Sequence, residues 1–392
     1  MARILILGGG FAAIAAAEKL SNSVGEDHEI TVVSNTGQFM FYPALVPMLF
    51  GDFEPDEIHF ELRPKLSEHG IRFIQGDVLS IDYERNTVKV TGEDVDGALH
   101  YDYLIVALGR RLATGRVPGF FEHAHHLLGL ESALKFKNAV SSFEKGAIVV
   151  GLCAEAFLPV PVCETALALA EKFKDRIAGG SVTLTAVFPT TLEKAFAGSA
   201  LFRDIDEEFD CKGIRMVSDF AVDRVGESTI TSVLGSTLHH DLLMLVPPFR
   251  GQASLQHLAP VTDDAGFAQV NERLQVKGYD NVYAAGDIVS LPGPRFGYMA
   301  IRQGKVAAAN IIAQLKGEEP NIEYTHRIEW ALGEKYTDPV FFHYGFWDET
   351  IDDFDENAFF GMAKVIRDHY GPVRADASVT GTPTVTAVGE SG

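Results

Sequence analysis

Three adjacent glycines follow the first apolar segment of the chain. Residues 3–9 (RILILGG) are typical of a buried strand, and residues 11–22 (FAAIAAAEKLSN) predict an alanine-rich helix. Gly8, Gly10 and Ala13 have the spacing G-x-G-x-x-G/A, in which Gly8 permits a tight turn and Gly10 admits a pyrophosphate to the backbone. The N–H groups and dipole at the start of the helix favour phosphate. The segment therefore predicts a dinucleotide site.

The end of the next strand departs from this pattern. Residues 28–35 (HEITVVSN) predict the second strand, and Ser34 and Asn35 stand where an acidic residue usually binds a ribose. Both side chains can hydrogen-bond a ribose, although less strongly than a carboxylate does.

Three later segments suit the same ligand. Gly109 ends the apolar strand YDYLIVALG, where the chain can pass close to a cofactor. Asp287 follows Gly286 in VYAAGD, where its carboxylate can accept from ribityl hydroxyls. A helix predicted over residues 298–317 directs the positive end of its dipole at a reduced isoalloxazine. Together these segments indicate FAD rather than NAD as the first ligand.

The middle of the chain repeats the alternation of strands and helices. The fold class predicted is α/β, with two Rossmann-like dinucleotide-binding domains, the second inserted in the first, and a C-terminal segment. The predicted division is as follows: FAD-binding domain 1–115 and 241–318; second domain, without nucleotide, 116–240; C-terminal quinone-side, membrane or oligomer segment 319–371; disordered tail 372–392.

Taken together, these motifs resemble those of a known group of proteins. Over roughly residues 1–345, the segments ILGGGFAAIAAAEKL, YDYLIVALG, VPPFRG, VYAAGD and GYMAIRQGKVAAANI resemble the two-dinucleotide-fold flavoproteins. Within them the chain is similar to the group of sulfide:quinone oxidoreductase, flavocytochrome c sulfide dehydrogenase and type II NADH dehydrogenase. FYPALVPMLFGDF (41–53) and DLLMLVPPFRG (241–251) are more similar to the sulfide-oxidising branch.

The resemblance implies one FAD and a reaction. Electrons are expected to pass from a sulfur species or another small donor through FAD to a quinone-like acceptor. Two alternatives stay open, an NADH:quinone reductase and a flavin-binding protein that has lost the cysteine chemistry. The cofactor-binding residues expected are Gly8, Gly10, Phe11, Ala12, Ser34, Asn35, Pro43, Val78, Ala107, Gly109, Gly286, Asp287, Met299 and Ala300.

The second dinucleotide turn is altered in VVGLCAEAFLPVPVCE (149–164). A nucleotide site would need glycines where Leu152, Ala154, Glu155 and Phe157 stand. Glu155 also places a negative charge where phosphates would bind. The second domain is therefore predicted to keep the fold without the nucleotide, which counts against the NADH alternative.

Two cysteines lie in this same segment. Cys153 ends a strand, and Cys163 is placed in the first turn of a helix, where the dipole can lower a thiol pKa. The resemblance implies a redox cysteine in this loop and a partner after the flavin helix, but IEYTHRIEWALGEKYTDPVFFHYGFW contains no cysteine. Cys153 and Cys163 then form a local redox pair, or are small buried hydrophobes in a protein without sulfur chemistry. Cys211 is expected to be structural or incidental.

The sequence gives less specific candidates for the residues that contact the electron acceptor. Glu164 matches a glutamate of the wider group and is expected to relay protons to a quinone, or else only to interact with the helix dipole. Arg302 is expected to face a quinone carbonyl. Phe249, Phe342 and Phe346 are candidates for a slot that holds a flat ring, with core packing as the alternative.

The composition of the chain limits the classes of molecule that it is expected to bind. The chain has 392 residues and a net charge of −21, which argues against nucleic-acid binding. No long apolar stretch or signal peptide is seen, and three cysteines suit a reducing compartment, so a cytoplasmic location is expected. The segments EHAHH and HH lack supporting ligands, so no metal site is predicted.

Contact with the cytoplasmic membrane is left open by the sequence. Residues 357–371 predict an amphipathic helix that lies on a membrane or docks on the protein, while the acidic segment DETIDDFDEN before it opposes lipid binding. A homodimer is also left open.

Overall fold

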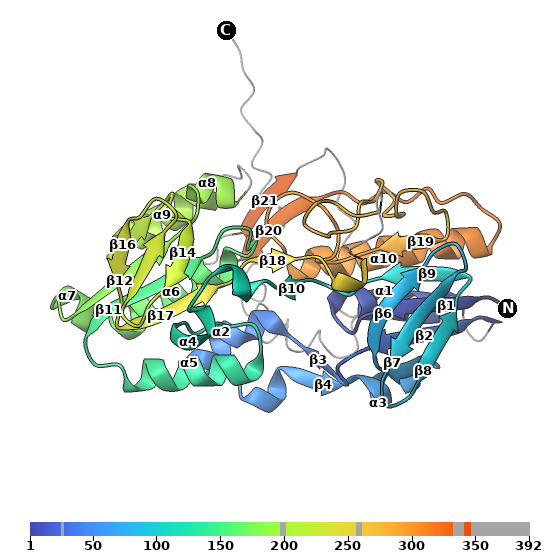
Figure 1. Ribbon diagram of the computed structural model, residues 1–392, viewed down its shortest axis with the longest axis horizontal. Helices are drawn as coiled ribbons and strands as arrows, with labels where there is room; N and C mark the ends of the chain where they lie inside the picture. The colour runs from blue at the N-terminus through green and yellow to red at the C-terminus, as the bar shows by residue number, and fades with distance from the viewer. Residues whose placement is uncertain (25–26, 197–200, 256–260, 332–340, 346–392) are drawn as a thin grey trace, which may run out of the picture.

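Two α/β units lie on either side of a pair of connecting segments. The computed structural model describes residues 1–24, 27–196, 201–255, 261–331 and 341–345. In Figure 1 the first unit, in blue and orange, lies on the right, and the second unit, in green and yellow, lies on the left. The two-domain α/β fold predicted from the sequence is confirmed.

The first unit is built on a five-stranded parallel sheet. Its order is β19 (Val282–Ala284), β9 (Tyr103–Val106), β1 (Arg3–Leu7), β2 (Glu29–Ser34) and β5 (Arg72–Gln75). The strands are almost wholly apolar because both faces of the sheet are covered. The covering elements are α1 (Phe11–Val24) and α10 (Gly297–Leu315) on one face, and the antiparallel strands β6 (Asp77–Asp82), β7 (Thr87–Thr91) and β8 (Asp96–His100) on the other.

Small residues bring α1 and α10 into close contact. The alanines of α1 from Ala12 to Ala17 are buried, and a Cβ on Gly304 of α10 would collide with the carbonyl oxygen of Ala12. This packing fixes where both helices begin, at the carboxyl ends of the strands.

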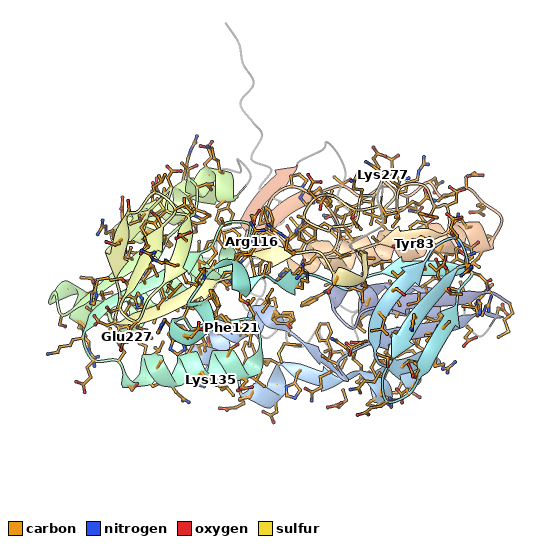
Figure 2. The ribbon with its side chains drawn as sticks, in the orientation of Figure 1. Tyr83, Arg116, Phe121, Lys135, Glu227 and Lys277 are labelled. Carbon is orange, nitrogen blue, oxygen red and sulfur yellow. The ribbon has the colours of Figure 1, made fainter. Side chains whose placement is uncertain are left out.

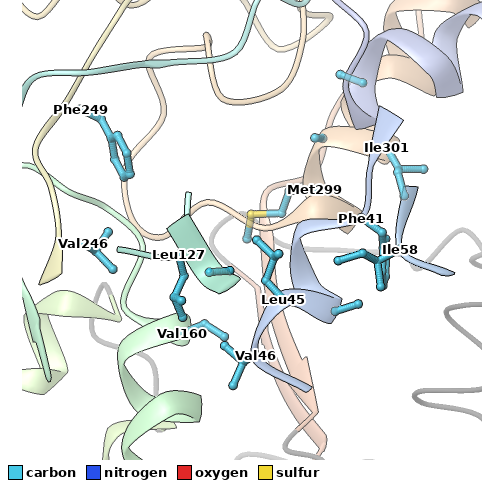
Figure 3. Close-up of a cluster of buried hydrophobic side chains, with 14 of the residues drawn as sticks. Phe41, Leu45, Val46, Ile58, Leu127, Val160, Val246, Phe249, Met299 and Ile301 are labelled. Carbon is cyan, nitrogen blue, oxygen red and sulfur yellow. The ribbon is translucent and has the colours of Figure 1, made fainter. Parts of the chain in front are cut away.

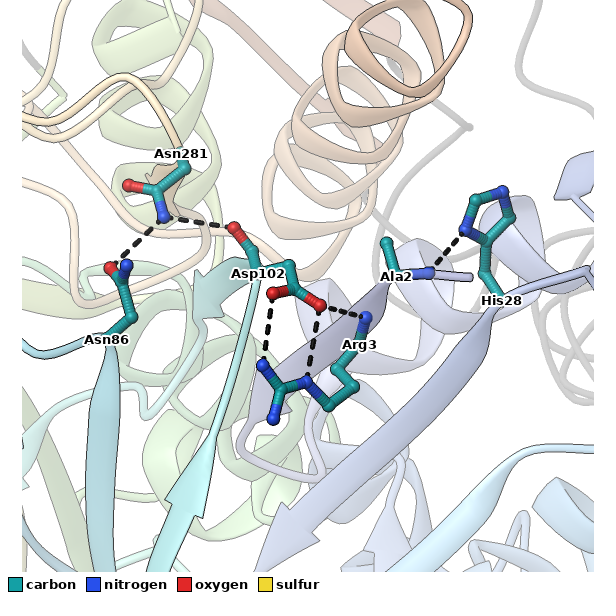
Figure 4. A network of polar contacts seen from close by, with 6 residues as sticks. All are labelled: Ala2, Arg3, His28, Asn86, Asp102 and Asn281. Carbon is teal, nitrogen blue, oxygen red and sulfur yellow. Dashed lines mark hydrogen bonds and ion pairs between the residues drawn. The ribbon is translucent and has the colours of Figure 1, made fainter.

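A polar network ties together the opposite ends of the same strands. Asp102 accepts from the backbone N–H of Arg3 at 2.7 Å and forms an ion pair with its guanidinium at 3.1 Å (Figure 4). The Asn281 amide donates to the carbonyl oxygen of Asp102 at 3.0 Å and to Asn86 at 3.2 Å. These contacts lie where β1, β9 and β19 begin, so they set the strand register at the end of the sheet away from the glycine turn.

The second unit has a four-stranded parallel sheet. Its order is β13 (Ile214–Val217), β12 (Val182–Val187), β11 (Gly146–Leu152) and β17 (Leu242–Val246). Helices α5 (Leu130–Ser142) and α6 (Val160–Lys172) share an apolar cluster with one face. The antiparallel strands β14 (Val222–Val225), β15 (Thr229–Ser232) and β16 (Thr237–His239) pack on the other face, together with α4 (Phe120–His123).

The boundary between the units differs from the sequence division. Strand β17 pairs with β11, so residues 242–246 belong to the second sheet and not to the first domain. The second helix of this unit begins at Val160, where Pro161 fits the first helical turn, and this places Cys163 in the first turn as expected.

Two connecting segments join the units as a short antiparallel ladder. Strand β10 (Arg111–Leu112) pairs with β18 (Phe249–Arg250), so that Leu112 lies opposite Phe249. Helix α2 (Leu45–Phe50) of the first unit packs on α5 and α6 of the second. The units are thus joined by the ladder and by a helical contact.

The remaining elements are short. They are β3 (Gln38–Met40), η2 (Tyr42–Ala44), η3 (Pro55–Glu57), β4 (His59–Glu61), α3 (Leu62–Ser67), η4 (Thr114–Arg116), α7 (Lys174–Ala178), α8 (Leu192–Ala195), α9 (Leu201–Cys211), η5 (Ala253–Leu255), β20 (Arg327–Ala331) and β21 (Phe341–Gly345). Among the described residues, no helix combines the length and apolarity needed to cross a bilayer.

Candidate functional site

The first glycine turn is closed toward the protein and open on its other side. Gly8 has φ +119°, and a Cβ there would collide with the carbonyl oxygen of Ala107. The Gly8 N–H donates to Val33 at 2.7 Å, which anchors the turn between β1 and β2. A Cβ on Gly10 would meet no atom within 4 Å. This shape fits a pyrophosphate lying against the backbone of Gly10.

The turn at Gly286, which precedes α10 in the chain, packs against the N-terminal end of α1. Gly286 has φ +81°, and a Cβ there would lie 3.1 Å from the Cβ of Ala12 and 3.6 Å from that of Ala300. Its N–H donates to the Gln303 side chain at 2.7 Å. A Cβ on Gly297 would lie 3.2 Å from the Phe11 ring. The structure therefore brings the two helix N-termini together.

The other predicted cofactor residues are more dispersed. Ser34 is buried and accepts from the N–H of Thr36 at 3.3 Å, whereas Asn35 is exposed. Pro43 is in η2, and Gly109 has φ +64°. Val78 packs in the apolar cluster on the opposite face of the first sheet, away from the helix face. Met299 and Ala300 are buried in the first turn of α10.

Arg110 is a site residue that the sequence analysis missed. Its guanidinium forms an ion pair with Asp287 and lies 4.1 Å from the ring centroid of Phe249. Burial lowers the pKa of Arg110 to about 10, so the group stays charged at neutral pH. The sequence signal for Arg110 is its position directly after Gly109, at the carboxyl end of a strand, where α/β sheets bind ligands. Phe249 is fully buried beneath this arginine.

The loop after β11 is closed by an ion pair. The Glu155 carboxylate accepts from Arg250 at 2.6 Å and lies 3.6 Å from Arg116, which Figure 2 shows between the two units. Glu155 and Phe157 have φ +61° and +44°, a backbone conformation that is costly without glycine. The glutamate thus holds the segment in which a second nucleotide would need glycines.

The start of α6 offers few N–H groups to a phosphate. Pro159 and Pro161 have no N–H, and the N–H groups of Val162 and Cys163 both donate to the carbonyl oxygen of Pro159 at 3.1 Å. This geometry does not fit a pyrophosphate.

The two loop cysteines are buried in different apolar clusters. Cys153 packs with β14 and β15, whereas Cys163 packs among α6 and its neighbours. Burial raises the pKa of Cys153 to about 12, and burial together with Glu164 raises the pKa of Cys163 well above its usual value. The prediction that the helix dipole makes Cys163 a thiolate is therefore wrong, because desolvation opposes the charge. Both cysteines are free, and Cys211 is free and exposed.

The acceptor-side candidates are only partly described. Glu164 in α6 and Arg302 in α10 are half-buried. Arg302 is close enough to His326 to lower the pKa of that imidazole. Phe342 pairs with Trp330 in the backbone ladder of β20 and β21, and its side chain is not described. Phe346 lies outside the described residues. No three side chains suited to a metal gather in the part of the chain that the structure describes.

An apolar cluster lies where the two units meet. Figure 3 shows residues of the first unit facing residues of the second across this region. The first unit contributes Phe41, Leu45, Val46, Ile58, Met299 and Ile301, and the second unit and its connection contribute Leu127, Val160, Val246 and Phe249. Met299 lies in the first turn of α10, so the cluster adjoins the helix start at which Gly286 and Ala12 meet.

Comparison with known proteins agrees with this geometry. The chain is 26% identical over 299 residues to the demethylphylloquinone reductase of Synechocystis sp., covering 73% of this chain and 71% of that protein. It is 25% identical over 335 residues to the sulfide-quinone reductase of Aquifex aeolicus, covering 80% and 76%. The structure of the Aquifex aeolicus sulfide:quinone oxidoreductase superposes with a TM-score of 0.78 at 23% identity, covering 88% of this chain and 83% of that one.

The family assignment rests on most of the chain. The sequence profile of the pyridine nucleotide-disulphide oxidoreductases matches residues 2–304, which include the glycine turn, the second unit and the start of α10. The chain therefore belongs to the pyridine nucleotide-disulphide oxidoreductase family, as a flavin oxidoreductase of the group predicted from its sequence.

Proposed function

We propose that the protein holds one FAD on the first unit and passes electrons from a small donor through it to a quinone. The observation that carries this proposal is the approach of the N-terminal ends of α1 and α10, where Gly297 lies against Phe11 and Gly286 lies against Ala12. Gly10 leaves the backbone open to the pyrophosphate, and α10 directs its N-terminal dipole at the isoalloxazine. Bound FAD would supply the capacity to accept two electrons and release them.

The second unit supports a donor other than a bound NAD(P)H. Glu155 and the prolines at the start of α6, Pro159 before the helix and Pro161 within it, replace the glycines and N–H groups that bind a pyrophosphate. The NADH:quinone reductase alternative is disfavoured on this ground.

Thiol chemistry at the flavin has no support from Cys153 or Cys163. Both are fully buried, and both have raised pKa values that keep them protonated at neutral pH. A sulfur donor would then have to react at the flavin itself, without a covalent link to these cysteines.

A quinone acceptor is supported by the apolar cluster next to α10 and by the names of two relatives. Phe41, Leu45 and Met299 are buried apolar residues of this cluster, and a flat ring would pack beside them. Arg302 and Glu164 remain candidates for the carbonyl contact and the proton relay. Attachment to a membrane surface, cytoplasmic location and a homodimer stay predictions.

The test begins with the purified, yellow protein. Its flavin is released and identified by chromatography, and the bound flavin is then reduced photochemically without oxygen. Rapid reoxidation by 1,4-naphthoquinone, but not by buffer alone, is expected. A colourless protein, or a reduced flavin that the quinone leaves unchanged, contradicts the proposal. Sulfide and NADH are mixed separately with the oxidised protein to identify the donor class.

A further inference from the structure

Arg295 is a buried cation that forms no ion pair with a carboxylate of the described residues. It directly precedes the start of α10, its side chain is almost enclosed, and only 8% of the residue is exposed. Among the described residues, no carboxylate lies within 4.0 Å of its guanidinium. The centroids of the Phe267 and Phe157 rings lie 5.7 Å and 6.0 Å from its guanidinium carbon.

A second guanidinium lies near enough to interact with it. Arg295 and the half-buried Arg110 repel one another, which helps to lower the pKa of Arg110 to about 10. Asp287 compensates the charge of Arg110 alone. Asp263 is near enough to Arg295 to oppose the lowering of its pKa, but forms no ion pair with it within 4.0 Å. Removing a cation from water without a directly paired counter-charge is unfavourable, so Arg295 is expected to meet an anion when the site is in use. A local positive site is also unusual in a chain of net charge −21.

Partly exposed apolar side chains lie near this pair. Phe157 is 41% exposed, and its carbonyl oxygen accepts from the backbone N–H of Arg295 at 3.0 Å. Leu112 is 37% exposed and lies opposite Phe249, on which Arg110 stacks. Tyr42 is 49% exposed and lies close enough to raise the pKa of Arg110. Exposed aromatic and aliphatic side chains therefore lie near both guanidinium groups.

We propose that Arg295, together with Arg110, selects an aromatic acceptor that carries a negative charge, such as a quinone ring with a carboxylate, a sulfonate or an ionised hydroxyl. The inference rests on the proposed function and names the substrate class of the same site. The guanidinium of Arg295 supplies the counter-charge, and Phe157 and Tyr42 supply faces for the ring. A neutral quinone would fill the apolar part and leave Arg295 without its partner.

Binding can be measured without turnover. The flavin-loaded protein is titrated by calorimetry with 2-naphthoate and with its neutral analogue 2-acetylnaphthalene. The anion is expected to bind at least about tenfold more tightly, and Arg295→Gln should abolish this preference while Arg295→Lys keeps part of it. The matched control is Arg224→Gln, which removes an exposed arginine from β14 of the second unit. Equal binding of the two compounds to the parent protein would overturn the inference.

Two other uses of Arg295 give different results in the same experiment. If Arg295→Gln releases the flavin, the guanidinium serves the cofactor and the inference is wrong. If inorganic phosphate displaces 2-naphthoate at equal concentration, the site takes any small anion, and the aromatic part of the inference is wrong.

Failure of this inference is distinguishable from failure of the proposed function. The photoreduced protein is mixed with 1,4-naphthoquinone and with 1,4-naphthoquinone-2-sulfonate. If both quinones reoxidise the flavin equally and 2-naphthoate binds no more tightly than its neutral analogue, the inference is wrong. The proposed quinone reductase function then still holds. Preferential binding of 2-naphthoate without reoxidation by either quinone supports the anion site and removes the proposed reaction.

Discussion

The Arg250 guanidinium and the Glu155 carboxylate meet at 2.6 Å, although 95 residues separate them in the chain. The contact joins the second connecting segment to the loop after β11. Glu155 also has positive φ, so the side-chain contact helps to hold a backbone conformation that its residue type disfavours. A position that would need glycine to bind a nucleotide is thus used to connect the two units.

This arrangement predicts slow reduction by NAD(P)H. Micromolar NADH or NADPH, mixed anaerobically with the oxidised protein, should leave the flavin absorbance unchanged over seconds, while photoreduction bleaches it fully. Glu155→Gln removes the negative charge but should not restore fast reduction, because Pro159 and Pro161 still lack N–H groups. Stoichiometric bleaching of the parent protein in a stopped-flow instrument would show that the nucleotide binds elsewhere.

The first glycine turn offers a matched pair of substitutions. Gly10→Val should leave the fold intact, since its Cβ meets no protein atom within 4 Å, but should block the pyrophosphate and give colourless protein. Gly8→Val places a side chain at φ +119° against Ala107, and should reduce the free energy of unfolding by at least about 2 kcal/mol. Flavin content and urea denaturation measure the two effects. Full flavin occupancy in Gly10→Val would contradict the assignment of the site.

The cysteines are predicted to matter for stability and not for electron transfer. Cys153→Ser and Cys163→Ser each bury a hydroxyl in an apolar cluster and should cost about 1–3 kcal/mol. Cys211→Ser, at an exposed position, should cost nothing measurable. In the native protein at pH 8, a thiol reagent should label Cys211 alone. Loss of sulfide-dependent flavin reduction in Cys153→Ser, with its fold intact, would restore a redox role for that thiol.

The sequence predicted the parts of the molecule whose pattern is local. The glycine turn, the strands of the first unit and the altered loop at 152–157 all follow from short segments, and the structure has the corresponding elements in place. The assignment of β17 was wrong because LLMLV is equally suited to either parallel sheet, and only its pairing with β11 decides. Cys163 was misjudged because its distance from the helix start says nothing of how deeply the helix is buried.

No motif marks Arg295 as a site residue, and the position of Arg110 directly after Gly109 gives no information about its partners. Each becomes a candidate only when its neighbours are known, Asp287 and Phe249 for Arg110, and Phe157 for Arg295. These neighbours come from separate segments of both units, so the spacing in the sequence gives no signal of the contact.

The last prediction concerns the pH dependence of stability at His326. This imidazole is almost fully buried, with Nε2 3.0 Å from the carbonyl oxygen of Pro292 and Nδ1 3.3 Å from the Tyr324 hydroxyl. Burial, with Arg295 and Arg302 nearby, lowers its pKa to about 4. The folded protein therefore favours the neutral ring, and the unfolded chain takes up the proton first as the pH falls. The contribution of His326 is full above about pH 6.5 and is lost progressively from there down to the folded pKa.

Comparing the unfolding free energies of the parent protein and of His326→Gln isolates the contribution of this histidine. Between pH 7.5 and 4.5, the free energy of unfolding of the parent should fall by about 2–3 kcal/mol more than that of His326→Gln, because glutamine does not titrate in this range. Urea denaturation at several pH values in the window measures both curves on flavin-loaded protein. Other histidines with lowered pKa values, His125 and His240 among them, contribute equally to both proteins and cancel. Parallel curves would mean that His326 has the same pKa in the folded and unfolded protein, and that its burial does not disfavour the protonated ring.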